Sequence, residues 1–174
     1  MAKRRTTTCA RIAPEQRVEV CVRRPSGPGP QIKGPGDVCA LLRGAEDRDR
    51  ESFYGVYLDS TGRVIGVEEI ARGGTTSVPI DPRTVFRGAI VSGAANLIVA
   101  HNHPSGQAVP SEDDKLLTKT LAEAGKIVGM PILDHVIVAR EGCYSFATSG
   151  RFSGIPQAST PTAPEPKAKR RRGC

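Results

Sequence analysis

Two histidines and one aspartate of this chain have the types and the spacing of metal ligands. His101 and His103 stand one residue apart in the segment HNHPSGQAVPSEDD, which covers residues 101–114. In an extended backbone, alternate side chains point the same way, so both imidazoles face one side. Prolines and glycines then indicate a loop, Ser111 is typical of a helix N-cap, and Asp114 falls in the first helical turn. Two imidazoles and one carboxylate can therefore converge on a point, which favours a catalytic zinc site with room for water.

Each of these residues also has a purely structural interpretation. A lone His-x-His pair is a weak signal for a metal. Asp114 stands three residues after Ser111, where the acid of a capping box would lie, although Asp is shorter than the usual Glu or Gln. The combination of the three residues, and not any one of them, favours the metal site.

The combination resembles a known motif. The block H-x-H-P, six further residues and then S-x-x-D resembles the JAMM motif of the JAB/MPN metalloprotease superfamily. The segment HNHPSG followed by PS-x-x-D resembles the RadC branch of this superfamily, whose members have long been labelled DNA repair proteins. The resemblance covers roughly residues 17–150 and implies a zinc-dependent metallopeptidase or isopeptidase. In such an enzyme, His101, His103 and Asp114 hold Zn²⁺, and zinc-activated water attacks an amide.

The resemblance also implies a general base and an oxyanion donor. In the family, a glutamate on the second strand of a hairpin acts as the base, and placing EEIARGG on that pattern points to Glu68. Glu69 is the alternative, and the pleat of a strand lets one of the two face the zinc. Either glutamate could instead be a solvated charge on the hairpin. Ser111 could cap its helix or donate to the oxyanion, and the resemblance favours the second role.

The dipeptide Asp134-His135 lies late in a predicted buried strand and is typical of the RadC branch. His135 has two interpretations that the sequence leaves open. It is either a hydrogen-bonded histidine of the core or a partner that orients a zinc ligand.

Hydrophobic patterning predicts an α/β fold. Alternating and wholly apolar runs predict strands over 17–23, 52–59, 63–71, 96–100, 132–139 and 143–147. Apolar residues at helical spacing predict helices over 37–44, over 81–94 and between Ser111 and Gly129. This order implies a mixed β-sheet flanked by helices, and the resemblance implies the same arrangement, a JAB/MPN-like (cytidine deaminase-like) sandwich. The apolar run 96–100 is expected to be a central strand that leads directly to His101.

The net charge of +7 is concentrated at the two ends of the chain. Residues 1–16 hold four Lys or Arg against one Glu, and residues 153–174 hold five against one. We expect a disordered basic arm over 1–16, a RadC-like JAB/MPN domain over 17–152 and a disordered basic tail over 153–174. Because residues 17–152 are net neutral, a basic globular face for nucleic acid is not indicated. Weak, non-specific nucleic-acid binding through the basic tails is the corresponding expectation.

The cysteine spacing and the lengths of the apolar runs indicate the cellular compartment of the protein. The five cysteines form no C-x-x-C pair, which favours reduced, unpaired thiols in a cytoplasmic protein. The sequence holds no apolar run of about eighteen residues, so we expect no membrane span. The basic start is followed by no apolar stretch, which argues against a secretory signal.

These observations leave one preferred function and two alternatives. The preferred function is hydrolysis of a peptide or protein substrate at an amide bond. The alternatives are a factor associated with DNA repair or recombination, and a protein-binding module without catalysis. The longer RadC proteins carry an N-terminal helix-hairpin-helix region, and its expected absence here weakens the repair alternative. Retention of all the expected site residues argues against the binding module. No motif specifies the substrate or the oligomeric state.

Overall fold

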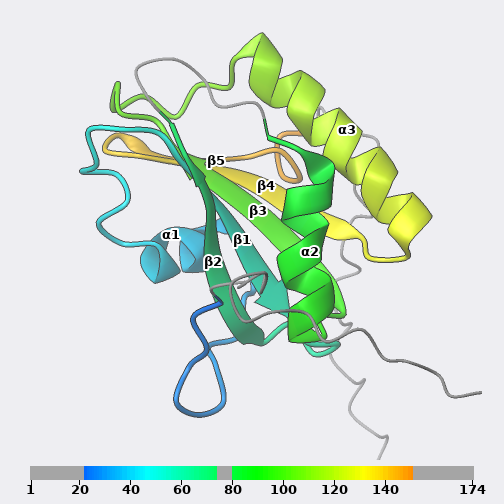
Figure 1. The fold of residues 1–174 in the computed structure, drawn as a ribbon. Helices are drawn as coiled ribbons and strands as arrows, with labels where there is room; N and C mark the ends of the chain where they lie inside the picture. Colours follow the sequence, from blue (N-terminus) through cyan, green and yellow to red (C-terminus); the bar gives the residue numbers. More distant parts are fainter. Residues whose placement is uncertain (1–21, 74–79, 151–174) are drawn as a thin grey trace, which may run out of the picture.

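The computed structural model describes residues 22–73 and 80–150 of the 174-residue chain (Figure 1). The predicted arm (1–16), the predicted tail (153–174) and most of the predicted strand 17–23 lie outside the described residues. At the end of that strand, Arg23 forms an isolated antiparallel bridge with Val67.

A mixed five-stranded sheet is the centre of the fold. Its strands are β1 (Ser52–Leu58), β2 (Val64–Arg72), β3 (Asn96–Asn102), β4 (Ile132–Ala139) and β5 (Gly142–Ser145). They lie in the order β2-β1-β3-β4-β5, in which β3 and β4 are parallel and the other neighbours are antiparallel. The predicted mixed sheet is therefore confirmed, and the helical connection between β3 and β4 explains their parallel pairing.

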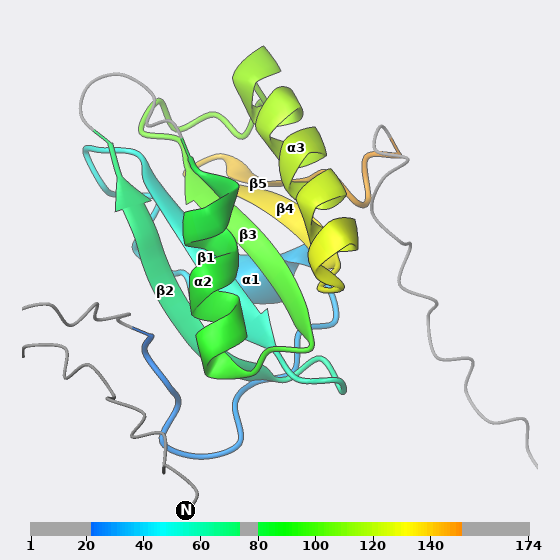
Figure 2. The same cartoon turned by 45° about the vertical axis from the view of Figure 1, so that its right-hand side comes forward.

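Helices cover both faces of this sheet. The short helix α1 (Pro35–Leu41) packs on one face, and α2 (Pro82–Ser92) and α3 (Glu112–Val128) pack on the other (Figure 2). We call these the α1 face and the α2–α3 face. Each face has its own apolar core, and alternate residues of β1 enter the two cores. Tyr54 and Val56 pack on the α1 face, whereas Phe53 and Tyr57 pack on the α2–α3 face. The α/β sandwich expected from the sequence is thus confirmed.

Local signals set the ends of the two long helices. The Asp81 carboxylate accepts a hydrogen bond from the Arg83 backbone N–H at the start of α2, and Pro82 occupies the first turn. Helix α3 starts after Ser111 and ends at Gly129, which has the left-handed φ of 73°. The first helix covers Pro35–Leu41 in place of the expected 37–44.

The central strand β3 extends two residues beyond its predicted end. Asn102 is fully buried, and its side-chain carbonyl accepts from the Ser52 backbone N–H while its amide donates to the Arg50 carbonyl. These bonds tie the end of β3 to the start of β1. His101 consequently belongs to the rigid sheet, and His103 follows directly after it.

One sequence prediction is wrong. The structure joins Cys39 of α1 to Cys143 of β5 in a disulfide, so these two thiols are not reduced and unpaired. The two cysteines are 104 residues apart in the chain, and the packing of α1 beside β5 brings them together. Among the described helices, none is long and apolar enough to cross a membrane.

Candidate metal centre

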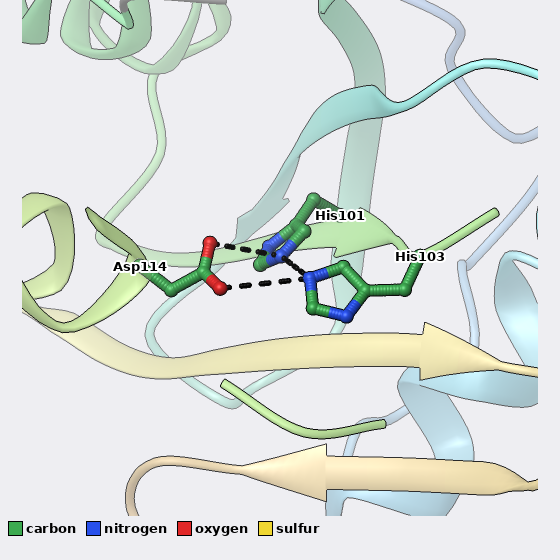
Figure 3. Close-up of side chains that lie close together, drawn as sticks. All are labelled: His101, His103 and Asp114. Carbon is green, nitrogen blue, oxygen red and sulfur yellow. Dashed lines mark hydrogen bonds and ion pairs between the residues drawn. The ribbon is translucent and has the colours of Figure 1, made fainter. Parts of the chain in front are cut away.

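His101, His103 and Asp114 converge at the end of β3, on the α2–α3 face (Figure 3). The Nε2 atoms of the two histidines are 2.9 Å apart. One carboxylate oxygen of Asp114 lies 3.1 Å from His101 Nε2, and the other lies 3.5 Å from His103 Nε2. His101 and Asp114 are buried and His103 is half-buried, so the three residues form a largely enclosed site. The structure thus brings together the three ligands expected from the sequence.

A chain of hydrogen bonds fixes the tautomer of His101. The Thr118 hydroxyl donates its proton to the Asp114 backbone carbonyl, so Thr118 Oγ1 must accept from His135 Nδ1, 2.5 Å away. Complete burial lowers the pKa of His135, which is therefore neutral and has a bare Nε2. That nitrogen lies 2.8 Å from His101 Nδ1 and accepts its proton. In the neutral ring of His101, Nε2 is then the nitrogen with a free lone pair, and it faces the site.

A single hydrogen bond sets the tautomer of His103. Its Nδ1 lies 3.0 Å from the Gln107 backbone carbonyl, which has no proton to donate. His103 Nδ1 must therefore carry a proton, and its Nε2 is the atom that points at His101 and Asp114.

These constraints allow a test of whether a cation fits the site. When both imidazoles are neutral, their Nε2 lone pairs and the Asp114 carboxylate, at 2.9–3.5 Å, would repel one another unless a positive charge lay between them. Ligands bound to tetrahedral zinc at about 2.0–2.1 Å are separated by about 3.3–3.4 Å. The observed contacts bracket that separation, and each ligand has a partner that holds its orientation. The residues present therefore fit a divalent metal ion.

Asp114 combines the two roles that the sequence leaves open. Its carboxylate accepts from the Ser111 backbone N–H and hydroxyl at 2.7 and 2.6 Å, and its own N–H donates to Ser111 Oγ at 3.1 Å. This is a capping box in which the acid also faces the histidines. Burial alone would raise the pKa of Asp114, but its close contacts with the imidazoles of His101 and His103 hold it well below its ordinary value. The same contact with Asp114 raises the pKa of His103.

Glu68 is not among the residues that meet at the triad. It lies on β2, on the α2–α3 face, and its buried carboxylate accepts a hydrogen bond from the Tyr57 hydroxyl. Burial and the contact with Glu68 raise the pKa of that hydroxyl. In the sheet, Glu68 pairs with Gly55, which pairs with Val99, two residues before His101. By strand spacing and rise, the Cα atoms of Glu68 and His101 are about 12 Å apart.

Helix α2 passes directly over the Glu68–Tyr57 pair at Gly88. A Cβ atom on Gly88 would lie 1.9 Å from a Glu68 carboxylate oxygen and 2.1 Å from the Tyr57 hydroxyl oxygen. The helix can approach this closely because Gly88 has no side chain.

Glu69 points to the opposite face of the sheet. Its carboxylate forms ion pairs with Arg48 at 2.8 Å and with Arg72 at 2.7 Å. Burial would raise the pKa of Glu69, but these two arginines lower it. The pleat therefore separates the two neighbours as expected, with Glu68 on the face that carries the triad.

His135 and Thr118 complete the site. Of the two interpretations of His135, the contact with His101 Nδ1 matches the orienting partner, and complete burial also makes it a core residue. Sequence reasoning missed Thr118. One signal was present, because Thr118 follows Asp114 by four residues and thus lies on the same side of the predicted helix.

Comparison with known proteins adds family evidence to this geometry. Residues 32–151 match the family described as RadC-like JAB domain. A UPF0758 protein of Burkholderia cenocepacia is 46% identical over 122 residues, which cover 69% of this chain and 47% of that protein. A UPF0758 protein of Rubrobacter xylanophilus is 46% identical over 122 residues, covering 70% of this chain and 53% of that protein. One of Desulforamulus reducens is 41% identical over 120 residues, covering 68% and 53%. The chain spans about half the length of these relatives.

Proposed function

Because the chain belongs to the RadC-like JAB domain family, we propose that it is a zinc-dependent hydrolase of peptide or isopeptide bonds. JAB domains include hydrolases, and the proposal assigns that chemistry to the site at the end of β3. One observation carries it: two imidazole nitrogens and one carboxylate oxygen, from His101, His103 and Asp114, meet within 4.8 Å of one another.

The types of the three ligands favour zinc. Two histidine nitrogens and one carboxylate oxygen are a common set for catalytic zinc, which keeps a further position for water or substrate. Bound zinc lowers the pKa of a coordinated water toward about 7 and polarises a carbonyl group. Asp114 is held by Ser111, and His101 is held by His135, so the chain itself fixes the ligand directions.

Two further side chains are assigned roles in this proposal. Ser111 stands beside Asp114, and its hydroxyl is the donor proposed to stabilise the oxyanion of the amide during attack. For that role the hydroxyl must turn away from the Asp114 carboxylate. Glu68 is proposed as the general base, supported by its position on the triad's face of the sheet. To take a proton from water at the triad, it must leave Tyr57 or act through a water chain.

A nucleic-acid factor remains the second candidate because of one observation. The excess positive charge lies in residues 1–16 and 153–174, and Lys and Arg in such segments attract phosphate backbones without reading bases. The neutral charge of residues 17–152 makes this candidate secondary.

A cytoplasmic location is also part of the proposal. The disulfide between Cys39 and Cys143 is the observation that speaks against it, because disulfides are rare in proteins of the reducing cytosol.

The experiment is a cleavage assay with the full chain. Protein loaded with zinc, protein stripped by a chelator and the His101→Ala variant are incubated with linear peptides and with lysine-linked isopeptides, and the products are identified by mass spectrometry. We expect amide cleavage by the loaded protein, loss on chelation, recovery with added zinc and no cleavage by the variant. Cleavage that persists in the folded, zinc-free variant would refute the proposal.

A further inference from the structure

A second concave site lies on the α1 face, on the opposite side of the sheet from the metal centre. It is bounded by the segment that precedes α1, the end of α1, and the strands β1 and β2. Tyr54 forms part of its wall, whereas its neighbour Phe53 stacks on His101 at the metal centre. Because neighbouring residues of a strand point to opposite faces, the two sites are separated by the sheet itself.

We propose that this pocket binds a small organic anion: a carboxylate or phosphate group carried on an apolar body. The pocket has a volume of about 590 Å³. That volume lies in the range of sites that enclose small organic molecules.

The floor of the pocket is apolar. Side chains from the end of α1, from the turn after it and from β2 line it: Leu41, Leu42, Ala45, Val64 and Val67. Leu42, Ala45 and Val64 belong to the core of the α1 face, so this surface is held rigidly. An apolar wall of this kind favours a hydrocarbon or aromatic body over a bare inorganic ion, which would gain nothing from it.

The rim carries arginines whose positive charge is not neutralised by an ion pair within residues 22–73 and 80–150. Arg23, Arg24 and Arg43 line the pocket, and none of their guanidinium groups has an ion-pair partner among the residues that the structure describes. A fourth arginine, Arg48, forms an ion pair with Glu69. Guanidinium groups bind carboxylate and phosphate oxygens through paired N–H donors. The three arginines without an ion-pair partner therefore favour an anionic head group.

The inner wall of the pocket includes an aromatic side chain, Tyr54. The Tyr54 hydroxyl is buried and has no hydrogen-bond partner within the described part of the chain. The guanidinium of Arg48 lies over the Tyr54 ring, 5.7 Å from its centre. The Tyr54 hydroxyl oxygen has almost no accessible surface, so Tyr54 contributes to the pocket through its ring and not as a hydrogen-bond donor.

The test measures binding of amphipathic anions to the full chain by isothermal titration calorimetry. Naphthyl phosphate and naphthoate represent the two head groups, and inorganic phosphate and naphthol represent the isolated parts. Backbone amide shifts in NMR spectra then locate the bound molecule. The informative variants are Arg24→Ala and Arg43→Ala, whose exposed side chains form no ion pair with another described residue. The matched control is Arg87→Ala, an exposed arginine of α2 on the other face.

We expect at least one of the two amphipathic anions to bind, and each isolated part to bind at least tenfold more weakly. The perturbed amides should belong to the end of α1 and to β2, at residues 41–45 and 64–67. Arg24→Ala and Arg43→Ala should each weaken binding by about tenfold, the factor expected for one lost charge-assisted hydrogen bond, and Arg87→Ala should leave it unchanged.

Three results would overturn the proposal. The first is equal binding of the amphipathic anions and inorganic phosphate. The second is unchanged affinity in both pocket variants. The third is amide shifts confined to His103 and Asp114, which would place the anion at the metal centre. A preference for naphthyl phosphate or for naphthoate identifies the natural head group, and either preference supports the proposal.

Discussion

The replacement Thr118→Val tests the hydrogen-bond chain that prepares His101 for a metal. Valine has nearly the shape of threonine but has no hydroxyl, so it can neither donate to the Asp114 carbonyl nor accept from His135 Nδ1. His135 is then free to carry its proton on Nε2, which faces His101. In that state His101 must place its own proton on Nε2, the atom that points into the site.

The structure sets the expected size of the effect. His135 is fully buried, so a side chain deprived of one partner destabilises the fold by about 1–3 kcal/mol. Replacement of residues that orient a metal ligand weakens metal binding by roughly 10–100-fold, or about 1.4–2.7 kcal/mol. We therefore expect Thr118→Val to weaken zinc binding by this factor in protein that is still folded.

The assay is zinc competition against a chromophoric chelator, together with ¹⁵N NMR of the histidine side chains in metal-free protein. The control is Thr120→Val, because the Thr120 hydroxyl makes the same backbone bond, to the Leu116 carbonyl, but lies exposed on α3. We expect control affinity within about twofold of the unaltered protein. Equal zinc affinity in the Thr118→Val and Thr120→Val variants, with an unchanged His101 tautomer, would refute the reasoning.

Three further predictions follow from particular residues. Glu68→Gln should keep its zinc but lose hydrolysis, because an amide cannot accept the proton, whereas Glu69→Gln should keep both; a loss confined to the Glu69 variant would contradict the assigned base. Cys39→Ser should lower the free energy of unfolding by about 2–4 kcal/mol in urea titrations without reductant, since it opens a closed loop of the unfolded chain. Unchanged stability in that variant would mean that the disulfide does not constrain the chain. Removal of residues 1–16 and 153–174 should abolish a weak, salt-sensitive DNA affinity and leave zinc content intact; sequence-selective binding by the trimmed chain would favour the nucleic-acid candidate instead.

Local patterns account for what the sequence predicted well. The apolar run before His101 is a buried central strand, and Ser111 and Gly129 delimit α3, because burial and capping are determined by a few neighbouring residues. The resemblance to the JAMM motif supplied the grouping of His101, His103 and Asp114. The pleat then separated Glu68 from Glu69, as expected for adjacent residues of a strand.

Contacts between distant segments could not be predicted in this way. His135 meets His101 because β4 lies parallel to β3, with His135 opposite Val99, and no local signal fixes that register. The disulfide depends on α1 packing beside β5. Likewise, the distance of Glu68 from the triad follows from strand pairing.

The most direct test of the central claim is the zinc content of purified full chain, measured by plasma mass spectrometry beside protein concentration. We expect about one zinc per chain, and loss of it in Asp114→Ala and in the double variant His101→Ala, His103→Ala. Asp113→Ala is the matched control, because Asp113 is an exposed neighbour in the same helical turn, and it should keep its zinc. Full zinc stoichiometry in the folded double variant would contradict the metal centre.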